Sequence, residues 1–266
     1  MKNKPILILL SMILPLLILA GQNPDKFLYM NTAMGYGHVK DSGTSPLRYH
    51  GLSGGANSGY IHHSSTHNFE ILGSVSSISG LVQEHILNYL STAMDFSYTH
   101  SLPVNLSDNT QLNAGAELYT SMNFLINPSY QNAAFNLDFL IKLALRAEIQ
   151  HKITIQAQTF HLAGIKFNIK EQSYSPFCRI DIPVLIFNGR PKYAYVSDSD
   201  LDFFNRHYFL GGFDLKTQLG IKKHLKNGNL MELSYIWRMG STGKRDIYLF
   251  EHGSHDLAFS LYFKLN

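Results

Sequence analysis

The sequence predicts an all-β protein, a closed antiparallel transmembrane β-barrel of about ten strands. Three observations support this fold class. The chain begins with a short apolar run that is typical of exported proteins, and the rest alternates apolar and polar residues over long segments. Charged residues make up only 15% of the 266 residues, whereas about a quarter is usual for a soluble domain. We therefore expect a surface that is poor in charge.

The N-terminus has the features of a secretory signal peptide. Lys2 and Lys4 precede an almost wholly apolar run over residues 5–20. A positive start, a short apolar run and small residues at its end are typical of such signals. The run is too short for a membrane helix, which needs about 20 apolar residues. We expect residues 1–21 to be a signal peptide that directs export to the outer membrane.

Cysteine content and charge exclude several kinds of site and partner. Cys178 is the only cysteine, so an internal disulfide and a Cys-based metal site are excluded. The formal net charge is +3 and the basic residues are scattered. Nucleic-acid binding is therefore not expected, and no motif indicates a cofactor.

The expected domain division follows from where strict alternation begins. Residues 22–46 are rich in Gly, Ser and Asn and are expected to form a periplasmic N-terminal segment or a plug. Residues 47–266 are expected to form the barrel, because a period of two indicates strands. The predicted strands cover residues 49–62, 67–78, 85–100, 112–126, 135–150, 153–167, 177–188, 209–222, 231–240 and 255–266. Eight strands remain possible if 49–62 or 177–188 is not a strand.

The last predicted strand and the hairpin before it are the clearest elements. Leu257, Phe259, Leu261, Phe263 and Leu265 alternate with mostly polar residues. Upstream, Asn227 and Gly228 separate two alternating segments, and Asn-Gly is the strongest short hairpin signal. The C-terminal part of the chain is therefore predicted to consist of hairpin-connected strands.

Strand length and the polar faces favour a membrane barrel over a soluble sandwich. Several segments keep their pattern for thirteen or more residues, whereas strands of soluble proteins average about five or six. A tilted strand needs about nine to eleven residues to cross a bilayer. The polar faces mix acids and bases that can pair inside a closed barrel, namely Glu117, Asp138, Lys142, Arg146, Glu148, Asp214, Lys216, Glu232 and Arg238.

Loop lengths give an expected orientation. Outer-membrane barrels have short periplasmic turns and longer external loops. The connections near residues 79–84, 127–132, 170–176 and 224–228 are expected at the periplasmic end. The turn at 62–67 and the connections near 101–109, 189–204 and 241–253 are expected outside.

The signal peptide and the strands up to the C-terminus resemble the small outer-membrane β-barrel superfamily of Gram-negative bacteria. In that superfamily the last strand usually ends in an aromatic residue. Here Phe263 lies three residues before the end and Asn266 is last, so the match to this signal is approximate. The resemblance implies contact with outer-membrane lipids and lipopolysaccharide, and with other outer-membrane proteins as possible partners. The superfamily includes enzymes, adhesins, pores and structural members, so the fold does not define the function.

One group of residues suggests a hydrolase. Ser64 lies beside His62 in a His-rich turn, and a second His group includes His255 near the last external loop. A hydrolase would need the His to take the Ser proton and a third group to orient it. The alternative is a polar turn without catalytic function.

Two further groups have weaker signatures. Asp198, Asp200 and Asp202 alternate as in a calcium loop, but Phe203 stands where the turn glycine is required, and a solvated acidic loop is the alternative. A basic run that includes Lys222 and His224 is expected to lie at a turn, in water.

Three functions are compatible with the sequence. The first is a non-enzymatic barrel that serves as a structural or assembly component of an outer-membrane complex, because about ten strands leave too narrow an interior for a general porin. The second is a lipid-modifying hydrolase that uses Ser64, His62 and His255. The third is a soluble secreted β-domain that binds a partner or a glycan.

Overall fold

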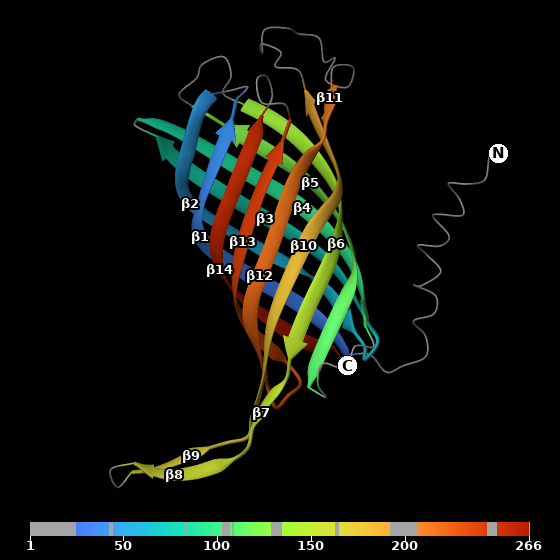
Figure 1. The fold of residues 1–266 in the computed structure, drawn as a ribbon. Helices are drawn as coiled ribbons and strands as arrows, with labels where there is room; N and C mark the ends of the chain where they lie inside the picture. Colours follow the sequence, from blue (N-terminus) through green and yellow to red (C-terminus); the bar gives the residue numbers. More distant parts are fainter. Residues whose placement is uncertain are drawn as a thin grey trace, which may run out of the picture.

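In the computed structural model, the chain forms a closed barrel of ten antiparallel strands (Figure 1). The structure describes residues 25–42, 45–82, 84–102, 107, 109–128, 135–162, 165–191, 207–243 and 249–265. The ring runs through β1 (Asp25–Asp41), β2 (Ser45–His63), β3 (His67–Val82), β4 (His85–Ser101), β5 (Thr110–Ile126), β6 (Phe135–His151), β10 (Gln172–Pro191), β12 (Gly212–His224), β13 (Leu230–Thr242) and β14 (Phe250–Leu265), and β14 pairs with β1. No helix in the described part of the chain is long and apolar enough to cross a membrane.

The alternating sequence turns the apolar residues outward and the charged residues inward. In β6, Ile141, Leu145 and Ile149 are 40%, 58% and 41% exposed, whereas Lys142 and Arg146 are buried. The same alternation runs around the ring. Closure pairs the backbone of every ring strand on both sides, which is what a sheet needs in lipid. The fold is thus an outer-membrane type of barrel, with an apolar outside and a polar inside.

Two predicted elements were wrong. Residues 25–41 form a ring strand that was not predicted, and residues 153–167 do not form the ring strand that was predicted, so the number of ring strands is still ten. Residues 25–41 form β1 between β14 and β2, so the barrel begins at Asp25 and these residues are not a plug. Asn31, Gly35 and Gly37 occupy inward positions of β1 and weaken the alternating signal. The predicted signal peptide lies outside the described residues.

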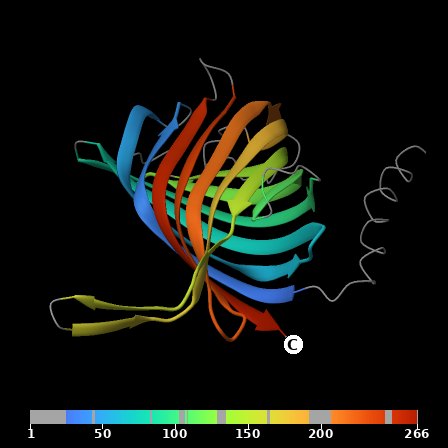
Figure 2. The same ribbon diagram turned by 60° about the horizontal axis from the view of Figure 1, so that its bottom comes forward.

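Residues 153–167 do not form a barrel strand. β7 (Ile153–Ile155) continues the ladder with β10 beyond the ring, and β8 (Gln158–Leu162) pairs only with β9 (Ile165–Ile169). Figures 1 and 2 show this hairpin projecting away from one end of the barrel. Alternation also occurs in a free hairpin, so the sequence pattern could not distinguish the two.

The first and the last ring strand begin and finish at the same end of the barrel, because Lys26 near the start of β1 pairs with Leu265 at the end of β14. We call this the terminal end and the opposite one the loop end. Residues 64–66, 102–109, 152–171 and 225–229 connect strands at the terminal end, and residues 42–44, 83–84, 127–134, 192–206 and 243–249 do so at the loop end. Four connections were therefore predicted at the wrong end of the barrel. The connections at 62–67 and 101–109 lie at the same end as 224–228, and those at 79–84 and 127–132 lie at the opposite end. The missed strand β1 caused this error, because it reverses the direction of each strand between it and residues 153–167. The strand β11 (His207–Leu210) extends the β10 edge at the loop end.

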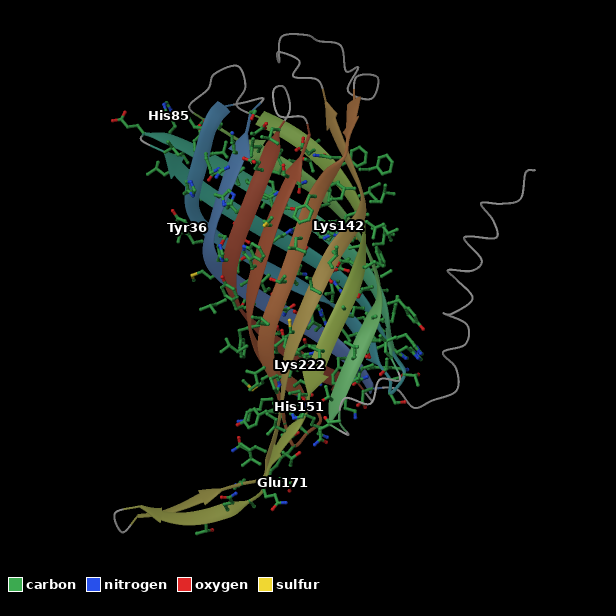
Figure 3. The ribbon with its side chains drawn as sticks, in the orientation of Figure 1. Tyr36, His85, Lys142, His151, Glu171 and Lys222 are labelled. Carbon is green, nitrogen blue, oxygen red and sulfur yellow. The ribbon has the colours of Figure 1, made fainter. Side chains whose placement is uncertain are left out.

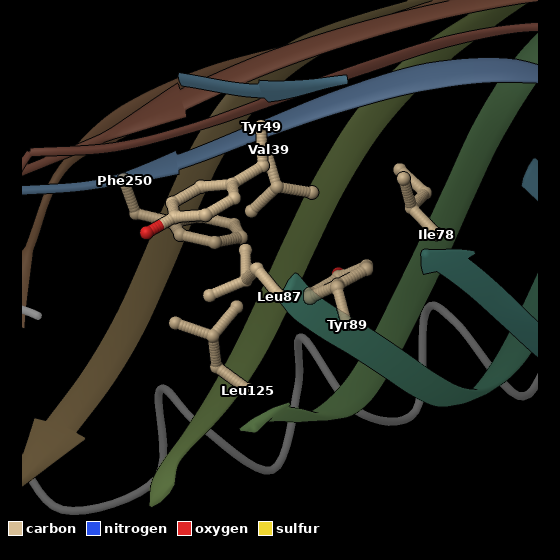
Figure 4. Packing of buried hydrophobic residues seen from close by; sticks show 7 residues of the cluster. All are labelled: Val39, Tyr49, Ile78, Leu87, Tyr89, Leu125 and Phe250. Atoms are coloured by element: carbon tan, nitrogen blue, oxygen red, sulfur yellow. The ribbon is translucent and has the colours of Figure 1, made fainter. Parts of the chain in front are cut away.

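Apolar side chains form a buried cluster in the lumen near the loop end. The cluster contains seven buried residues contributed by β1, β2, β3, β4, β5 and β14 (Figure 4), namely Val39, Tyr49, Ile78, Leu87, Tyr89, Leu125 and Phe250. The hydroxyl of Tyr49 accepts a hydrogen bond from Asn127 Nδ2 at 3.2 Å. This cluster narrows the lumen behind the loops.

The closed ring predicts heat-dependent migration in SDS gels. We expect the unboiled, detergent-extracted protein from the outer-membrane fraction to migrate differently from the boiled protein, because SDS does not open a fully paired ring until it is heated. A water-soluble band with no shift on boiling would contradict the membrane barrel.

Candidate functional site

The main polar feature of the barrel is a charged network in the middle of the lumen. It is built from inward residues of strands β3, β4, β5, β6, β10, β12 and β13. Its charged members are Glu70, Asp95, Glu117, Lys142, Arg146, Glu148, Arg179, Asp181, Asp214, Lys222 and Arg238. Buried charges must be paired and hydrogen-bonded, so the contacts of each member define what the network does.

Arg146 is the centre of this network. Its Nε donates to Asp181 Oδ1 at 2.7 Å. Nη1 donates to Glu70 Oε2 and Nη2 to Glu117 Oε2, both at 2.9 Å, and a longer contact of 3.4 Å reaches Asp95. The Arg146 side chain is only 2% exposed. One guanidinium therefore links β6 to acids on β3, β4, β5 and β10.

Two contacts of the network cross the lumen. Arg179 on β10 donates to Glu70 on β3 at 3.1 Å, and Arg238 on β13 donates to the hydroxyl of Tyr119 on β5 at 3.3 Å. The partners in each contact are four strands apart in a ring of ten, so the side chains meet inside the barrel rather than along its wall. The network therefore ties opposite walls together.

Further pairs extend the network along the barrel axis. Lys142 binds Asp214 at 3.0 Å and Glu117 at 3.5 Å. Arg238 holds the same Asp214 through two bonds of 3.0 Å. Toward the terminal end, Arg179 binds Glu148 at 2.6 Å. Figure 3 shows Lys222 nearer the terminal end than Lys142.

The network lies between two cavities of the lumen. A cavity of about 340 Å³ near the terminal end is lined by Glu70 and Arg146. A cavity of about 140 Å³ further toward the loop end is lined by Asp95, Tyr119 and Arg238. The contacts of Arg146 with Glu70 and Asp95 thus join the walls of the two cavities. The arrangement links the walls of the barrel and occupies lumen space between the two cavities.

The sequence identified part of this network. Glu117, Lys142, Arg146, Glu148, Asp214 and Arg238 were predicted on polar faces, and all line the lumen. Glu70, Asp95, Arg179 and Asp181 were missed, although each lies at an inward position of an alternating strand. Lys222 was expected in water but is 9% exposed inside the lumen. Extending the period-two pattern through β3, β4 and β10 would have found the missing four.

The structure does not bring Ser64 and His255 together. Ser64 follows β2 at the terminal end, whereas His255 pairs with Tyr36, which pairs with Leu52 of β2. Leu52 and His62 are ten positions apart on β2, or roughly 33 Å at the usual rise. His255 is on the outer face, where its Nδ1 lies 2.5 Å from the Tyr235 hydroxyl. A hydrolase site that combines Ser64, His62 and His255 is therefore not formed.

Ser64 does have a His neighbour, but it is His67 rather than His62. The Oγ of Ser64 lies 3.1 Å from His67 Nδ1 and accepts the backbone N–H groups of Thr66 and His67. Thr66 Oγ1 lies 3.0 Å from the same Nδ1. His67 Nε2 has no hydrogen-bond partner among the described residues, so no group orients the ring from the side opposite Ser64. His62 stacks on His67, with ring centroids 5.6 Å apart. These contacts are those of a side chain that closes a tight turn.

We expect Ser64→Ala to lower the stability of the barrel by about 0.5–1.5 kcal/mol, the usual contribution of a lost hydrogen bond. Thermal unfolding in detergent would measure the change. Ser64→Asn, which can still accept the two N–H groups, should restore most of it. If both variants were as stable as the parent protein, the hydroxyl would not support the turn.

The candidate metal ligands are not supported by the described residues. Asp198, Asp200 and Asp202 lie outside the part of the chain that the structure describes. Within the described ranges, no group of three or more His, Cys, Asp or Glu residues is arranged to hold a metal ion.

Comparison with known proteins adds the following findings. No protein-family model matches the sequence, and no curated protein matches it significantly. The transport unit of the autotransporter AIDA-I from Escherichia coli is 11% identical, with a TM-score of 0.47 over 94% of this chain and 92% of that one. The translocator domain of autotransporter NalP from Neisseria meningitidis is 8% identical, with a TM-score of 0.39 over 97% and 94%. The toluene transporter TodX from P. putida is 8% identical, with a TM-score of 0.30 over 92% and 91%.

Proposed function

We propose that this protein is a non-conducting outer-membrane barrel that serves as a structural or assembly component of an envelope complex. The observation that carries the proposal is the charged network centred on Arg146, which ties opposite walls of the lumen together. A transport pathway would need this space. The apolar cluster around Tyr49 narrows the lumen further toward the loop end.

The outer face of the barrel supports the proposed location in the outer membrane and the proposed contacts with lipids. Large apolar side chains are exposed on β1, β4, β5, β6 and β14, and Met34, Leu145 and Leu257 are more than half exposed. Large exposed apolar areas are otherwise rare on soluble proteins. We infer that the face contacts outer-membrane lipids, including lipopolysaccharide, and that the chain is exported by a cleaved signal peptide. The terminal end would then face the periplasm.

The β8–β9 hairpin is the element that we propose engages a partner protein. It pairs with no ring strand, and the described residues 151–159 leading to it are exposed. An isolated two-stranded hairpin is marginally stable in water. Residues 152–162 would reach roughly 35 Å beyond the barrel if fully extended. A partner on the periplasmic side would stabilise the hairpin.

The proposal predicts no stepwise conductance. In planar lipid bilayers, the purified protein should produce no current steps under conditions in which a sixteen-stranded porin does, because open aqueous channels appear only in much larger barrels. The migration shift on boiling verifies that the protein is folded. Regular current steps from the folded protein would contradict the non-conducting function.

Shortening the hairpin should remove the partner but leave the barrel folded. Ile153 pairs with Tyr174, so residues 154–173 can be replaced by Asn-Gly, which suits a two-residue hairpin. We expect a native gel of gently solubilised membranes to show the parent protein in a larger complex, and the shortened variant outside it. The matched control replaces residues 243–249 by Asn-Gly, because Thr242 pairs with Phe250. Persistence of the complex without the hairpin would contradict the proposal.

A further inference from the structure

The cavity at the terminal end is large enough for a small ligand. Its volume is about 340 Å³, and ligand pockets start at about 300 Å³. It lies within the lumen between the charged network and the ring of strand ends. Charged and polar side chains share the lining with apolar ones such as Phe27, Ile61 and Leu230.

The charges that line this cavity are unequal. Five Lys and Arg side chains face three Asp and Glu side chains. Glu70 is already bound to Arg146 at 2.9 Å and to Arg179 at 3.1 Å. Glu148 is bound to Arg179 at 2.6 Å. Glu70 and Glu148 are therefore paired with arginines, and Arg146 is also compensated by Glu117 and Asp181, which lie outside the lining. Lys264 is paired with Asp25, so the positive excess of the lining comes from Lys152 and Lys222.

Lys222 has one acidic neighbour, Glu148, at a longer distance than the other Lys and Arg pairs of the network. Its Nζ lies 3.7 Å from Glu148 Oε1 and 3.5 Å from Gln150 Oε1, and it sits over the Phe177 ring at 4.5 Å. By contrast, Lys142 in the middle of the network has an acid at 3.0 Å. A buried ammonium that is incompletely paired lowers the stability of the folded protein. An anion in the cavity would compensate it.

Two imidazoles flank Lys222 in the cavity. His224 lies two residues away on β12, and one of its nitrogens, Nε2, lies 2.8 Å from Ser175 Oγ. His63 on β2 lines the same cavity and is four strands from β12 around the ring. Ring nitrogens and an ammonium thus approach the cavity from different walls.

We propose that the terminal cavity binds a small phosphorylated anion, with Lys222 as the principal charge contact and His63 and His224 as flanking donors. An ammonium is a common phosphate-binding group, and the low dielectric of the lumen strengthens the attraction. The phosphoryl group is carried either by a free solute or by a short lipid headgroup, and the small volume of the cavity favours the solute. Lys152, at the start of the connection to the hairpin, also lines the cavity, but the proposed contacts lie on β2 and β12, so the site does not depend on the proposed partner protein.

Titration calorimetry on the full chain in a neutral detergent tests this site. Glycerol 3-phosphate is the first probe, a short-chain phosphatidic acid is the second, and glycerol at matched ionic strength is the blank. We expect glycerol 3-phosphate to bind and glycerol not to bind. Binding of the phosphatidic acid alone would overturn the free solute as the source, and binding of neither phosphate would overturn the site.

Lys222→Gln should weaken binding by roughly ten- to a hundredfold, as expected for the loss of a hydrogen bond to a charged group. Lys216→Gln is the matched control, because it removes the same charge from the same strand but at the other cavity. We expect the control to bind like the parent protein. Equal losses in the two variants would mean a general effect of charge and would overturn the site.

The migration shift on boiling checks that each variant folds. If Lys222→Gln fails to fold, Lys222→Arg and His224→Gln replace it. We expect the arginine variant to keep the affinity within a few fold and the His224 variant to lose several fold. If a folded His224→Gln protein bound glycerol 3-phosphate as tightly as the parent protein, His224 would not contribute to the site.

Discussion

Arg146→Ala is expected to destabilise the barrel by about 3–5 kcal/mol, the range for removing one partner of a buried ion pair. The variant would leave Asp181, Glu70 and Glu117 as buried carboxylates without their shared cation. Unfolding by urea in lipid vesicles would measure the change. Trp237 is the only tryptophan and lies on the outer face opposite His255, so its fluorescence reports loss of the membrane environment.

Arg48→Ala is the control for this prediction. Arg48 binds Glu251 at 2.8 Å, but its side chain is 49% exposed. Exposed pairs contribute about 0–1 kcal/mol, so this variant should unfold almost like the parent protein. Arg146→Lys should be intermediate, because an ammonium cannot reproduce the several directed bonds of a guanidinium. If Arg146→Ala and Arg48→Ala lost equal stability, the network would not brace the barrel.

The sequence predicted the inward and outward faces well where the inward residues are charged. In β6, Lys142, Arg146 and Glu148 alternate with Ile141, Leu143 and Leu145, and this contrast sets the register of both faces. In β1, Asn31, Gly35 and Gly37 lie inward, and a glycine gives no clear polar signal. The strand nearest the predicted signal peptide was missed for this reason.

The pairing of charges could not be predicted from alternation alone. Alternation places Arg179 and Glu70 inside the barrel, but their contact depends on how far neighbouring strands are staggered around the ring. That stagger is a property of the closed barrel. A different error explains Ser64 and His255. Both were expected at the external end of the barrel, but the missed strand β1 inverted the strand parity and so placed the Ser64 turn at the wrong end.

Leu145→Arg is expected to destabilise the barrel in lipid vesicles by about 2–4 kcal/mol, the usual cost of arginine on the lipid face near the bilayer midplane. Leu145 lies in the middle part of β6, faces outward and is 58% exposed. On a soluble protein, a charge at such an exposed position would change stability by less than about 0.5 kcal/mol. The variant therefore tests directly what surrounds the outer face.

Leu81→Arg is the matched control for Leu145→Arg, because Leu81 is 56% exposed on the same face but lies one residue before the end of β3. Near the interface the cost of arginine falls to about 0–1 kcal/mol. A large loss for Leu145→Arg and a small one for Leu81→Arg would trace the depth of the bilayer along the barrel. Small losses at both positions would contradict a membrane around the outer face, whereas large losses at both would mean that the lipid reaches the loop end.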